Sequence, residues 1–274
     1  MAANDPNPKN LVQSLAKGLR ILSVFTAEEP ELLLSEVARR AGVDNATAFR
    51  FLNTLVMLGY VTKIANTKRF RLTLKPLELG FNAIARMDLR DIARPLLRSL
   101  VGTLNEAASL GILDNTEVVY VERVQAGLIR LGANVRVGTR IPAYYSAIGH
   151  AIMAHLPHDH VRHILTVSDR IKLTPAMQVS VSHLERQIDL VRKRGYALSD
   201  GDIVSGLRIL AVPALDDGGT VLGSLSVAAP SMRMTKDQFV ALALEPLLQA
   251  AHDFSRACSA AGQTLQPLPK ANAG

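Results

Sequence analysis

The sequence of 274 residues contains few of the residues on which several classes of protein depend. Its one cysteine, Cys258, leaves no partner for a disulfide within the chain and excludes a zinc site with several cysteine ligands. Tryptophan is absent, and no uncharged apolar run approaches the ~20 residues that cross a bilayer. The first ten residues also lack the basic stretch and apolar stretch of a signal peptide. We therefore expect a cytoplasmic protein that makes no contact with a membrane.

The short motifs of common enzymes and nucleotide-binding proteins are missing as well. The chain has no G-x-S-x-G elbow, no Walker loop and no G-x-G-x-x-G turn. Five of the seven histidines lie within residues 150–163, but at ~100° per helical residue only His160 and His163 share a face. We expect no catalytic site, no metal and no cofactor. Two alternatives stay open: a metal-sensing repressor, and an enzyme with Asp200 or Asp202 as its base.

Positive charge is concentrated in one short segment of the chain. The formal net charge is +7, and residues 39–75 carry eight basic side chains against one acidic side chain, Asp44. A basic segment attached to a neutral body can hold a polyanion, since each phosphate that it neutralises releases condensed counterions. The alternative is a basic face that serves solubility. The local pattern of the segment favours the first interpretation.

Apolar spacing predicts a helix-turn-helix followed by a hairpin in this part of the chain. The expected helices and strands cover residues 11–25, 32–42, 45–58, 60–64 and 69–74. Ser35 is the expected N-cap of the second helix, Gly42 its end, and Asp44 the N-cap of the third. Leu58 closes the expected buried stripe of the third helix. A short helix, a tight turn, a longer helix and a basic hairpin are the elements of a winged helix-turn-helix, typical of DNA-binding proteins.

The exposed start of the third helix and the hairpin carry side chains suited to DNA. Small and hydrogen-bonding residues can approach base edges, while basic residues contact phosphates. The predicted DNA-binding residues are Arg40, Asn45, Ala46, Thr47, Arg50, Asn53, Lys68, Arg69 and Arg71. Of these, we expect Thr47, Arg50 and Asn53 to enter the major groove of double-stranded DNA.

The remainder of the chain predicts an α+β domain. Strand-like segments cover residues 108–113, 118–124, 207–215 and 221–227, and helical segments cover 89–104, 147–155, 159–166, 181–194 and 235–255. Hairpins interrupted by helices indicate an antiparallel sheet. The predicted organisation is a disordered amino terminus at 1–10, a DNA-binding domain at 11–76, a linker helix at 77–90, an α+β domain at 91–256, and a flexible tail at 257–274.

Several strings together resemble the IclR family of bacterial transcriptional regulators. They are SLAKGLRILSVF, LSEVARRAGVDNATAFRFLNTLVMLGYV and FRLTLKPLELG in the first part, and VGTRIPAYYSAIGHAIMAHLP, VRKRGYALSDGD, GLRILAVPAL and SLSVAAP in the second. The resemblance implies a winged helix-turn-helix, a linker helix and a GAF-like effector domain. It also implies homodimers or dimers of dimers on near-palindromic operators.

The resemblance further implies an effector pocket on the concave face of the sheet. Its matching positions are Ile141, Ala147, Ile148, Ser199, Ile209, Ser226 and Ala228. Ser199 and Ile209 stand where some relatives have acidic or thiol side chains, so the pocket is expected to be more apolar and to favour a larger or aromatic carboxylate. Tyr144 and Tyr145 are expected to supply a ring wall.

Arg123 or Arg130 is the expected partner for the carboxylate of such an effector, because a guanidinium can bind it through two hydrogen bonds. The string GTRIPAYYSAIG also resembles the subgroup that controls aromatic-acid breakdown. The sequence therefore predicts a ligand-responsive transcriptional regulator of catabolic genes whose effector is a small organic acid.

Overall fold

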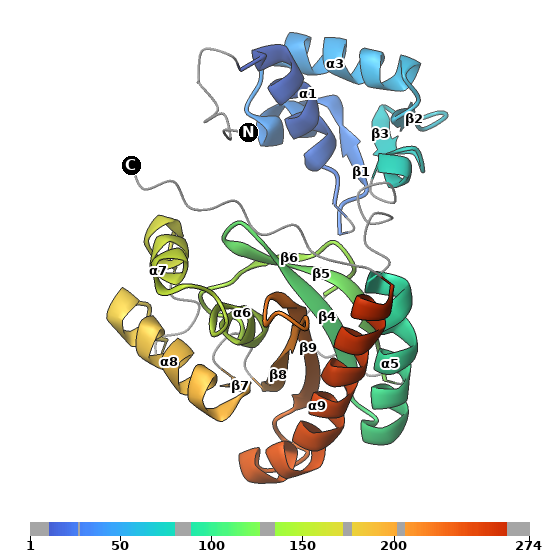
Figure 1. The fold of residues 1–274 in the computed structure, drawn as a ribbon. Helices are drawn as coiled ribbons and strands as arrows, with labels where there is room; N and C mark the ends of the chain where they lie inside the picture. Colours follow the sequence, from blue (N-terminus) through green and yellow to red (C-terminus); the bar gives the residue numbers. More distant parts are fainter. Residues whose placement is uncertain are drawn as a thin grey trace. The chain divides into compact units, whose positions relative to one another are not determined.

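The computed structural model describes residues 11–26, 28–79, 89–126, 135–171, 177–201 and 206–261. The chain divides into two compact units, Met1–Arg86 and Met87–Gly274 (Figure 1). Each unit combines helices with an antiparallel sheet, which confirms the predicted mixed fold class. Within the described ranges, no helix is both long and apolar enough to cross a bilayer.

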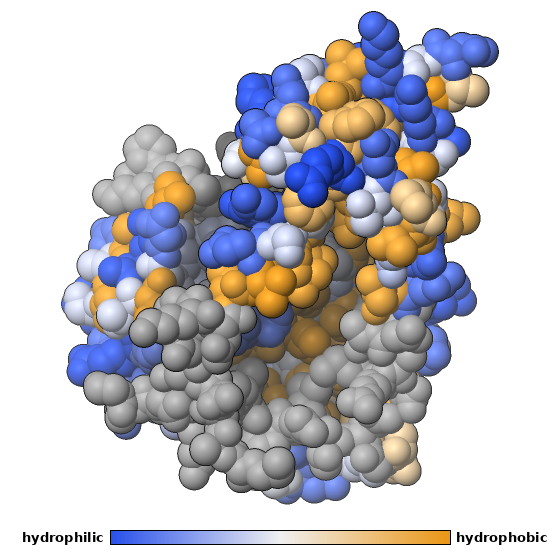
Figure 2. Space-filling view, turned by 90° about the horizontal axis from the view of Figure 1, so that it is seen from above, coloured by the Kyte–Doolittle hydropathy of each residue, from blue (hydrophilic) through white to orange (hydrophobic). Residues whose placement is uncertain are grey.

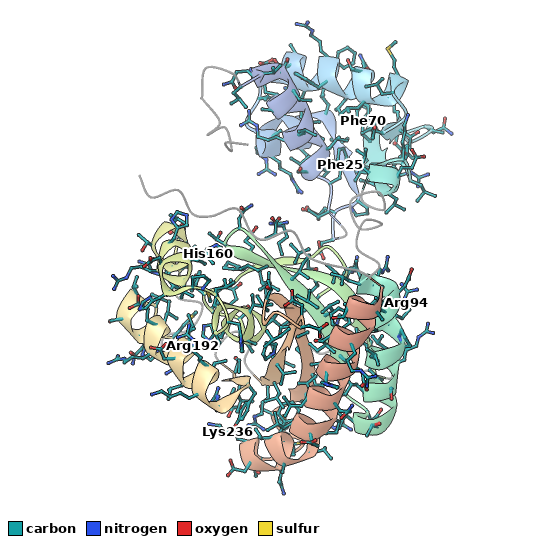
Figure 3. The ribbon with its side chains drawn as sticks, viewed as in Figure 1. Phe25, Phe70, Arg94, His160, Arg192 and Lys236 are labelled. Carbon is teal, nitrogen blue, oxygen red and sulfur yellow. The ribbon has the colours of Figure 1, made fainter. Side chains whose placement is uncertain are left out.

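A small sheet and several helices, besides a helical stretch at residues 76–79, form the described part of the N-terminal unit. The elements are α1 (Gln13–Ser23), β1 (Glu31–Leu33), α2 (Leu34–Ala41), α3 (Asn45–Met57), β2 (Val61–Lys63) and β3 (Arg69–Leu72). The strands lie in the order β1-β3-β2, and β3 pairs antiparallel with both neighbours. Ile21, Val37 and Leu52 are fully buried in the core of this unit. Phe25 and Phe70 are buried there too and are labelled in Figure 3.

Two of the three predicted helix signals in this unit are confirmed. Gly42 ends α2 with φ +64°, in the left-handed region that glycine adopts without strain. Asp44 caps α3, because its Oδ1 accepts a 2.8 Å hydrogen bond from the backbone N–H of Thr47. The tight turn between α2 and α3 therefore follows from local sequence chemistry.

The expected N-cap Ser35 and the expected burial of Leu58 were wrong. The N-cap is Leu33, two residues before Ser35, and α2 begins at Leu34, directly after strand β1, which the spacing did not predict. Pairing of Leu32 with Phe70 keeps the chain extended up to Leu33, and the backbone N–H of Leu33 donates to Glu36 Oε2 at 2.7 Å. Leu58 is the C-cap residue of α3 and is 52% exposed.

A six-stranded antiparallel sheet forms the centre of the C-terminal unit, in the order β6-β5-β4-β9-β8-β7. Its strands are β4 (Ala107–Asp114), β5 (Glu117–Val124), β6 (Arg140–Pro142), β7 (Ala197–Asp200), β8 (Leu207–Leu215) and β9 (Val221–Pro230). The edge strands β6 and β7 were not predicted, because each is short. Hairpin turns at Asn115, φ +55°, and Gly219, φ +79°, confirm the two predicted hairpins.

Helices cover both faces of this sheet (Figure 1). One face packs against α5 (Leu89–Leu104) and α9 (Lys236–Ala260), and its core includes Leu97, Leu225 and Phe254. The other face packs against α6 (Ala147–Met153), which packs in turn against α8 (Val181–Arg194), and α8 packs against α7 (His158–Val167). The sheet is therefore an internal layer between two apolar cores.

The ends of the predicted domains differ in part from the observed elements. Of the predicted linker helix at 77–90, residues 77–79 are helical, 80–88 lie outside the described residues, and 89–90 already belong to α5. The predicted tail is wrong at its start, because α9 continues to Ala260. Burial of Cys258 against the sheet core accounts for this extension. Residues 1–10 and 262–274 lie outside the described residues.

Two glycines in helices provide a test of the packing in the C-terminal unit. A Cβ atom at Gly149 of α6 would overlap the backbone of Ala143, whereas one at Gly102 of α5 would meet nothing within 4 Å. We expect Gly149→Ala to destabilise the protein by about 2 kcal/mol and Gly102→Ala to stabilise it by about 0.5–1 kcal/mol. Urea unfolding followed by circular dichroism measures both, and equal effects of the two substitutions would contradict the packing of α6.

Candidate nucleic-acid interface and effector site

The outward face of α3 presents several of the predicted DNA-binding residues. Asn45, Ala46, Arg50 and Asn53 are exposed, while Leu52 on the opposite side of the helix is fully buried. At ~100° per residue, Ala46 and Asn53 lie within about 20° of each other, and Arg50 lies beside them. The structure therefore brings Ala46, Arg50 and Asn53 onto one face, with Asn45 to one side of it.

Thr47 also secures the first turn of α3. Its hydroxyl donates to Asp44 Oδ2 at 2.7 Å, in addition to the bond from its backbone N–H. The hydroxyl bond, followed by the backbone bond, holds the pKa of Asp44 below its ordinary value. Asp44 therefore stays ionised at the positive end of the helix dipole, where a negative charge is favoured.

The predicted basic residues of α2 and of the hairpin differ in how freely they can reach a phosphate. Lys68, in the turn, and Arg71, on β3, are exposed. Arg69 donates through Nη1 to the backbone oxygen of Glu31 at 2.9 Å. Arg40 pairs with Glu29 Oε2 at 2.5 Å, and its side chain is only 22% exposed. Lys68 and Arg71 can thus reach a phosphate more freely than Arg40 and Arg69.

Two residues near this face were missed by the sequence reasoning. Lys17 of α1 lines a depression of about 370 Å³, whose other lining residues are Ser14, Thr47, Arg50, Phe51 and Thr54. It was missed because it lies outside the basic segment at 39–75. Phe49 is 50% exposed on α3, which its helical spacing from Ala46 and Asn53 could have indicated. In Figure 2, apolar patches interrupt the hydrophilic surface of the N-terminal unit.

A row of polar side chains crosses the face of the large sheet that packs against α6. Arg123 of β5 pairs with Ser109 of β4, and Ser109 pairs with Ser226 of β9. Arg123 Nη1 donates to Ser109 Oγ at 2.9 Å. Ser109 and Ser226 are buried, so this row is a polar strip inside an apolar layer. Ser109 was not among the predicted residues, since a single serine in a strand carries no signal of its own.

The guanidinium of Arg123 is only partly satisfied. Its Nε atom is buried and has no hydrogen-bond partner among the described residues. Burial lowers the pKa of Arg123, and the nearby Tyr120 partly opposes that shift. An arginine nevertheless remains protonated in proteins. The site therefore holds a buried cation with an unused donor, and a carboxylate would satisfy it.

The other predicted pocket residues are divided between the sheet and α6. Ser199, Ile209 and Ala228 form the next cross-strand row, because Ser199 pairs with Ile209 and Ile209 with Ala228. Ala147 and Ile148 are buried on α6. Ile141 lies on β6, the edge strand opposite β7, so the sheet does not bring it next to Ser199. Arg130 lies outside the described residues.

The two tyrosines have different environments. Tyr144 is fully buried, and its hydroxyl both donates to the backbone oxygen of Ile171 and accepts from its N–H, at 3.1 and 2.8 Å. The Tyr145 ring meets it edge to face, with centroids 5.0 Å apart, and is half-buried. Tyr144 is therefore part of the core, whereas the ring of Tyr145 keeps exposed surface that a ligand could contact.

Glu122 precedes Arg123 but points to the opposite face of the sheet. A bulge in the pairing of β5 with β4 lies at this point. Glu122 Oε2 accepts hydrogen bonds from Arg90 Nε at 2.8 Å and from Arg94 Nε and Nη2 at 3.0 and 2.8 Å. Arg94 is labelled on α5 in Figure 3. Glu122 thus attaches the start of α5 to the strand that carries Arg123.

The residues of the enzymatic and metal-binding alternatives do not assemble into a site in the described part of the chain. Asp200 pairs with Arg208 at 2.7 Å, and Asp202 lies outside the described residues. Burial raises the pKa of Cys258 to about 11, which keeps the thiol protonated. His150 Nε2 lies 2.7 Å from the backbone oxygen of Tyr144. No group of three metal-ligating side chains occurs among the described residues.

A basic helix-turn-helix with a wing, joined to a sheet domain with a buried polar strip, defines a DNA-binding regulator with an effector domain. The chain belongs to the IclR family of bacterial transcriptional regulators. The IclR helix-turn-helix domain matches residues 14–65, and the C-terminal domain of the bacterial transcriptional regulator IclR matches residues 81–256. Members of this family are transcriptional regulators and not enzymes, so the enzymatic alternative is not favoured.

Individual relatives agree with this assignment. The chain is 32% identical over 226 residues to the HTH-type transcriptional regulator KdgR of Dickeya chrysanthemi, covering 82% of this chain and 74% of the relative. A crystal structure of a transcriptional regulator from Rhodococcus sp. RHA1 matches 92% of this chain and 100% of its own, at 32% identity and TM-score 0.79. An IclR homologue from Microbacterium hydrocarbonoxydans, complexed with 4-hydroxybenzoate, has the same fold, at 23% identity and TM-score 0.78 over 90% of this chain and 99% of its own.

Two buried glutamates give a pH-dependent test of the contacts around the sheet. Burial would raise the pKa of Glu122, but hydrogen bonds from Arg90 and Arg94 outweigh it and hold the pKa below its ordinary value. The stabilisation by Glu122 is therefore complete above the unfolded pKa of about 4.3 and is lost as the pH falls through the lower folded pKa. We expect Glu122→Gln to cost about 2 kcal/mol at pH 7, and the cost to shrink in acid.

Glu106 is the matched control for this prediction. Burial raises its pKa, and the partner Arg233, 2.7 Å away, only partly compensates. Its charged form is disfavoured in the folded state, so Glu106→Gln should cost less than Glu122→Gln at pH 7. Urea unfolding at pH 7 and pH 4 measures both substitutions. A larger cost for Glu106→Gln at pH 7 would show that the contacts of Glu122 with α5 are not the stabilising ones.

Proposed function

We propose that this protein is a ligand-responsive regulator of catabolic genes that binds near-palindromic operators. In this proposal residues 11–76 bind DNA, residues 77–90 link the two parts, and residues 91–256 bind a small organic carboxylate and oligomerise. The C-terminal domain corresponds in the proposal to the GAF-like fold expected from the sequence. A regulator of this kind acts on the bacterial chromosome, in the cytoplasm.

The exposed face of α3 and the hairpin support the DNA contacts of this proposal. Arg50 and Asn53 are free to donate to base edges, and Ala46 lets the helix approach closely. Lys68 and Arg71 are exposed and suited to phosphates or the minor groove. Residues 45–57 of α3 include no acidic side chain, so the N-cap Asp44 is the one negative charge at this helix.

The partly satisfied guanidinium of Arg123 is the observation that carries the effector proposal. A buried donor without a partner costs free energy, which a bound carboxylate would recover. Ser109 and Ser226 lie beside it in the same cross-strand row and offer two further hydroxyls. The neighbouring positions Ile209, Ala228 and Ala211 are apolar, which suits the hydrocarbon part of the ligand.

This apolar surrounding favours an aromatic or larger aliphatic acid over a two-carbon or three-carbon acid. Tyr145 is half-buried and can contribute a ring contact. The relative complexed with 4-hydroxybenzoate is only 23% identical to this chain and supports the fold rather than the ligand. The proposal of an aromatic acid therefore depends on the residues of this chain.

An exposed apolar stripe on α1 supports assembly of two copies. Leu15 and Leu19 are four residues apart on one face of α1 and are 63 and 56% exposed, and Leu11, just before the helix, is 57% exposed. A monomer would leave this stripe in water, whereas a second copy would bury it. A homodimer also matches the two-fold symmetry of a near-palindromic operator.

Glu122 offers a route by which the effector alters DNA binding. It ties β5, which carries Arg123, to the first turns of α5, which begins three residues after the boundary at Arg86. In the proposal, a carboxylate on Arg123 shifts β5, and α5 passes the shift to the linker. The effector controls DNA affinity only if it binds two arrangements of the dimer unequally.

Substitutions of Arg50 and Lys68 separate base recognition from phosphate contact. We expect Arg50→Ala to cost roughly 1–3 kcal/mol on operator DNA and to relax sequence preference, because Arg50 reads a base edge. Lys68→Ala should weaken operator and scrambled DNA about equally and reduce the salt dependence. Fluorescence anisotropy with DNA from upstream of the gene and a scrambled duplex measures both. Equal losses on both duplexes for Arg50→Ala would contradict its assignment to the major groove.

Substitution of Arg123 tests the effector site. We expect the wild type to bind benzoate or 4-hydroxybenzoate more tightly than the neutral analogue benzamide, and Arg123→Gln to lose at least about tenfold in affinity for the acid. Isothermal titration calorimetry measures both, with pyruvate as the small aliphatic comparison. Arg140→Gln is the control, since Arg140 pairs with Glu117 and Asp114 outside the strip. Undiminished binding of the acid by Arg123→Gln would exclude Arg123 as the anchor.

A further inference from the structure

Phe49 is an aromatic side chain exposed on the outward face of α3. It is 50% exposed, although Ala48 and Leu52 of the same helix are fully buried. Helix geometry places Ala46, Phe49 and Asn53 within about 60° of one another, with Phe49 at the edge of the exposed face, about 60° from the buried Leu52. The core of the N-terminal unit is completed by other rings, those of Phe25 and Phe70, so the fold does not require Phe49.

The surroundings of Phe49 indicate what the ring can contact. Arg50 and Asn53, both exposed, flank it with hydrogen-bond donors, and Ala46 leaves space beside the ring. The α3 sequence NATAFRFLNTLVM has no acidic residue, and the exposed residues Lys68 and Arg71 belong to the same unit. An apolar ring within a basic, hydrogen-bonding surface fits an anionic partner that also presents an apolar group.

The major groove of DNA is such a partner. The C5-methyl group of thymine is the apolar group that base pairs display there, next to the donors and acceptors that amide and guanidinium side chains recognise. A helix inserted by its exposed face brings neighbouring side chains to neighbouring bases. Phe49 would therefore meet a base adjacent to the one that Arg50 or Asn53 contacts.

We propose that Phe49 is a specificity-determining residue that contacts the methyl group of a thymine in each operator half-site. The proposal rests on the assignment of α3 as the recognition helix. It adds a sequence preference that hydrogen bonds alone do not supply. The ring reads the methyl group, so deoxyuridine, which pairs as thymine does but lacks that group, is the matched probe.

The experiment first obtains an operator by in vitro selection from random duplexes with the full-length protein. Each thymine of the enriched sequence is then replaced singly by deoxyuridine, and affinity is measured by fluorescence anisotropy at constant salt. We expect one thymine per half-site at which the wild type loses about fourfold, the value of one buried methyl group. Phe49→Ala should bind the thymine operator more weakly and show no loss at that position.

Two further variants separate base reading from general damage to the helix. We call the loss of affinity on replacement of that thymine by deoxyuridine the uracil loss. Phe49→Leu keeps an apolar side chain and should retain part of the uracil loss. Met57→Ala removes another exposed apolar side chain of α3, 87% exposed near the end of the helix, and should keep the whole loss. Thermal unfolding should be nearly unchanged in Phe49→Ala, because the ring is half exposed already.

Four results would overturn the proposal. A uracil loss that persists in Phe49→Ala would show that another side chain reads the methyl group. No uracil loss at any thymine in the wild type would show that none is read. A shift of Phe49→Ala to a smaller oligomer, with the uracil loss intact, would show that Phe49 lies in an interface between copies of the chain. Failure of the selection to enrich any sequence would contradict the assignment of α3 as the recognition helix. This outcome is distinguishable from failure of the Phe49 proposal alone, because the selection uses the wild type and precedes every variant.

Discussion

Burial of the six-stranded sheet on both faces is the constraint on which the C-terminal unit depends. The first nine residues of β9 are buried, and helices on each side complete two apolar cores. A polar group inside such a layer costs free energy unless it is hydrogen-bonded. The polar side chains that remain there, above all Arg123 and the serines beside it, are therefore the ones that call for a functional explanation.

Glu122 and Arg123 show how this constraint separates structural from binding roles. Both lie at the bulge of β5 and both carry charge, but they point to opposite faces. Glu122 is surrounded by donors from Arg90 and Arg94, so its charge is fully compensated and its role is attachment of α5. Arg123 has one serine hydroxyl and a buried, unpaired Nε. Strand β5 thus carries a charged side chain with a compensated charge on one face, and on the other face a charged side chain with a donor available to a ligand.

Local signals predicted most helices and hairpins because their causes are local. The Asp44 cap, the left-handed Gly42 and the turn at Asn115 act within a few residues of themselves. The failures involve partners distant in sequence. Strand β1 forms only because β3 pairs with it, and that pairing displaced the expected cap at Ser35. Edge strands β6 and β7 are likewise stabilised by neighbours rather than by their own pattern.

The sequence by itself determined the class of this protein: the basic segment, the helix-turn-helix spacing and the family strings are all properties of consecutive residues. It also identified Arg50 and Asn53, because helical spacing determines which side chains share a face. Only the tertiary structure decided that Lys17 lines the same depression as Arg50 and that Ser109 is the hydroxyl beside Arg123. Those pairs meet through packing between separate helices and pairing between separate strands, which no local pattern encodes.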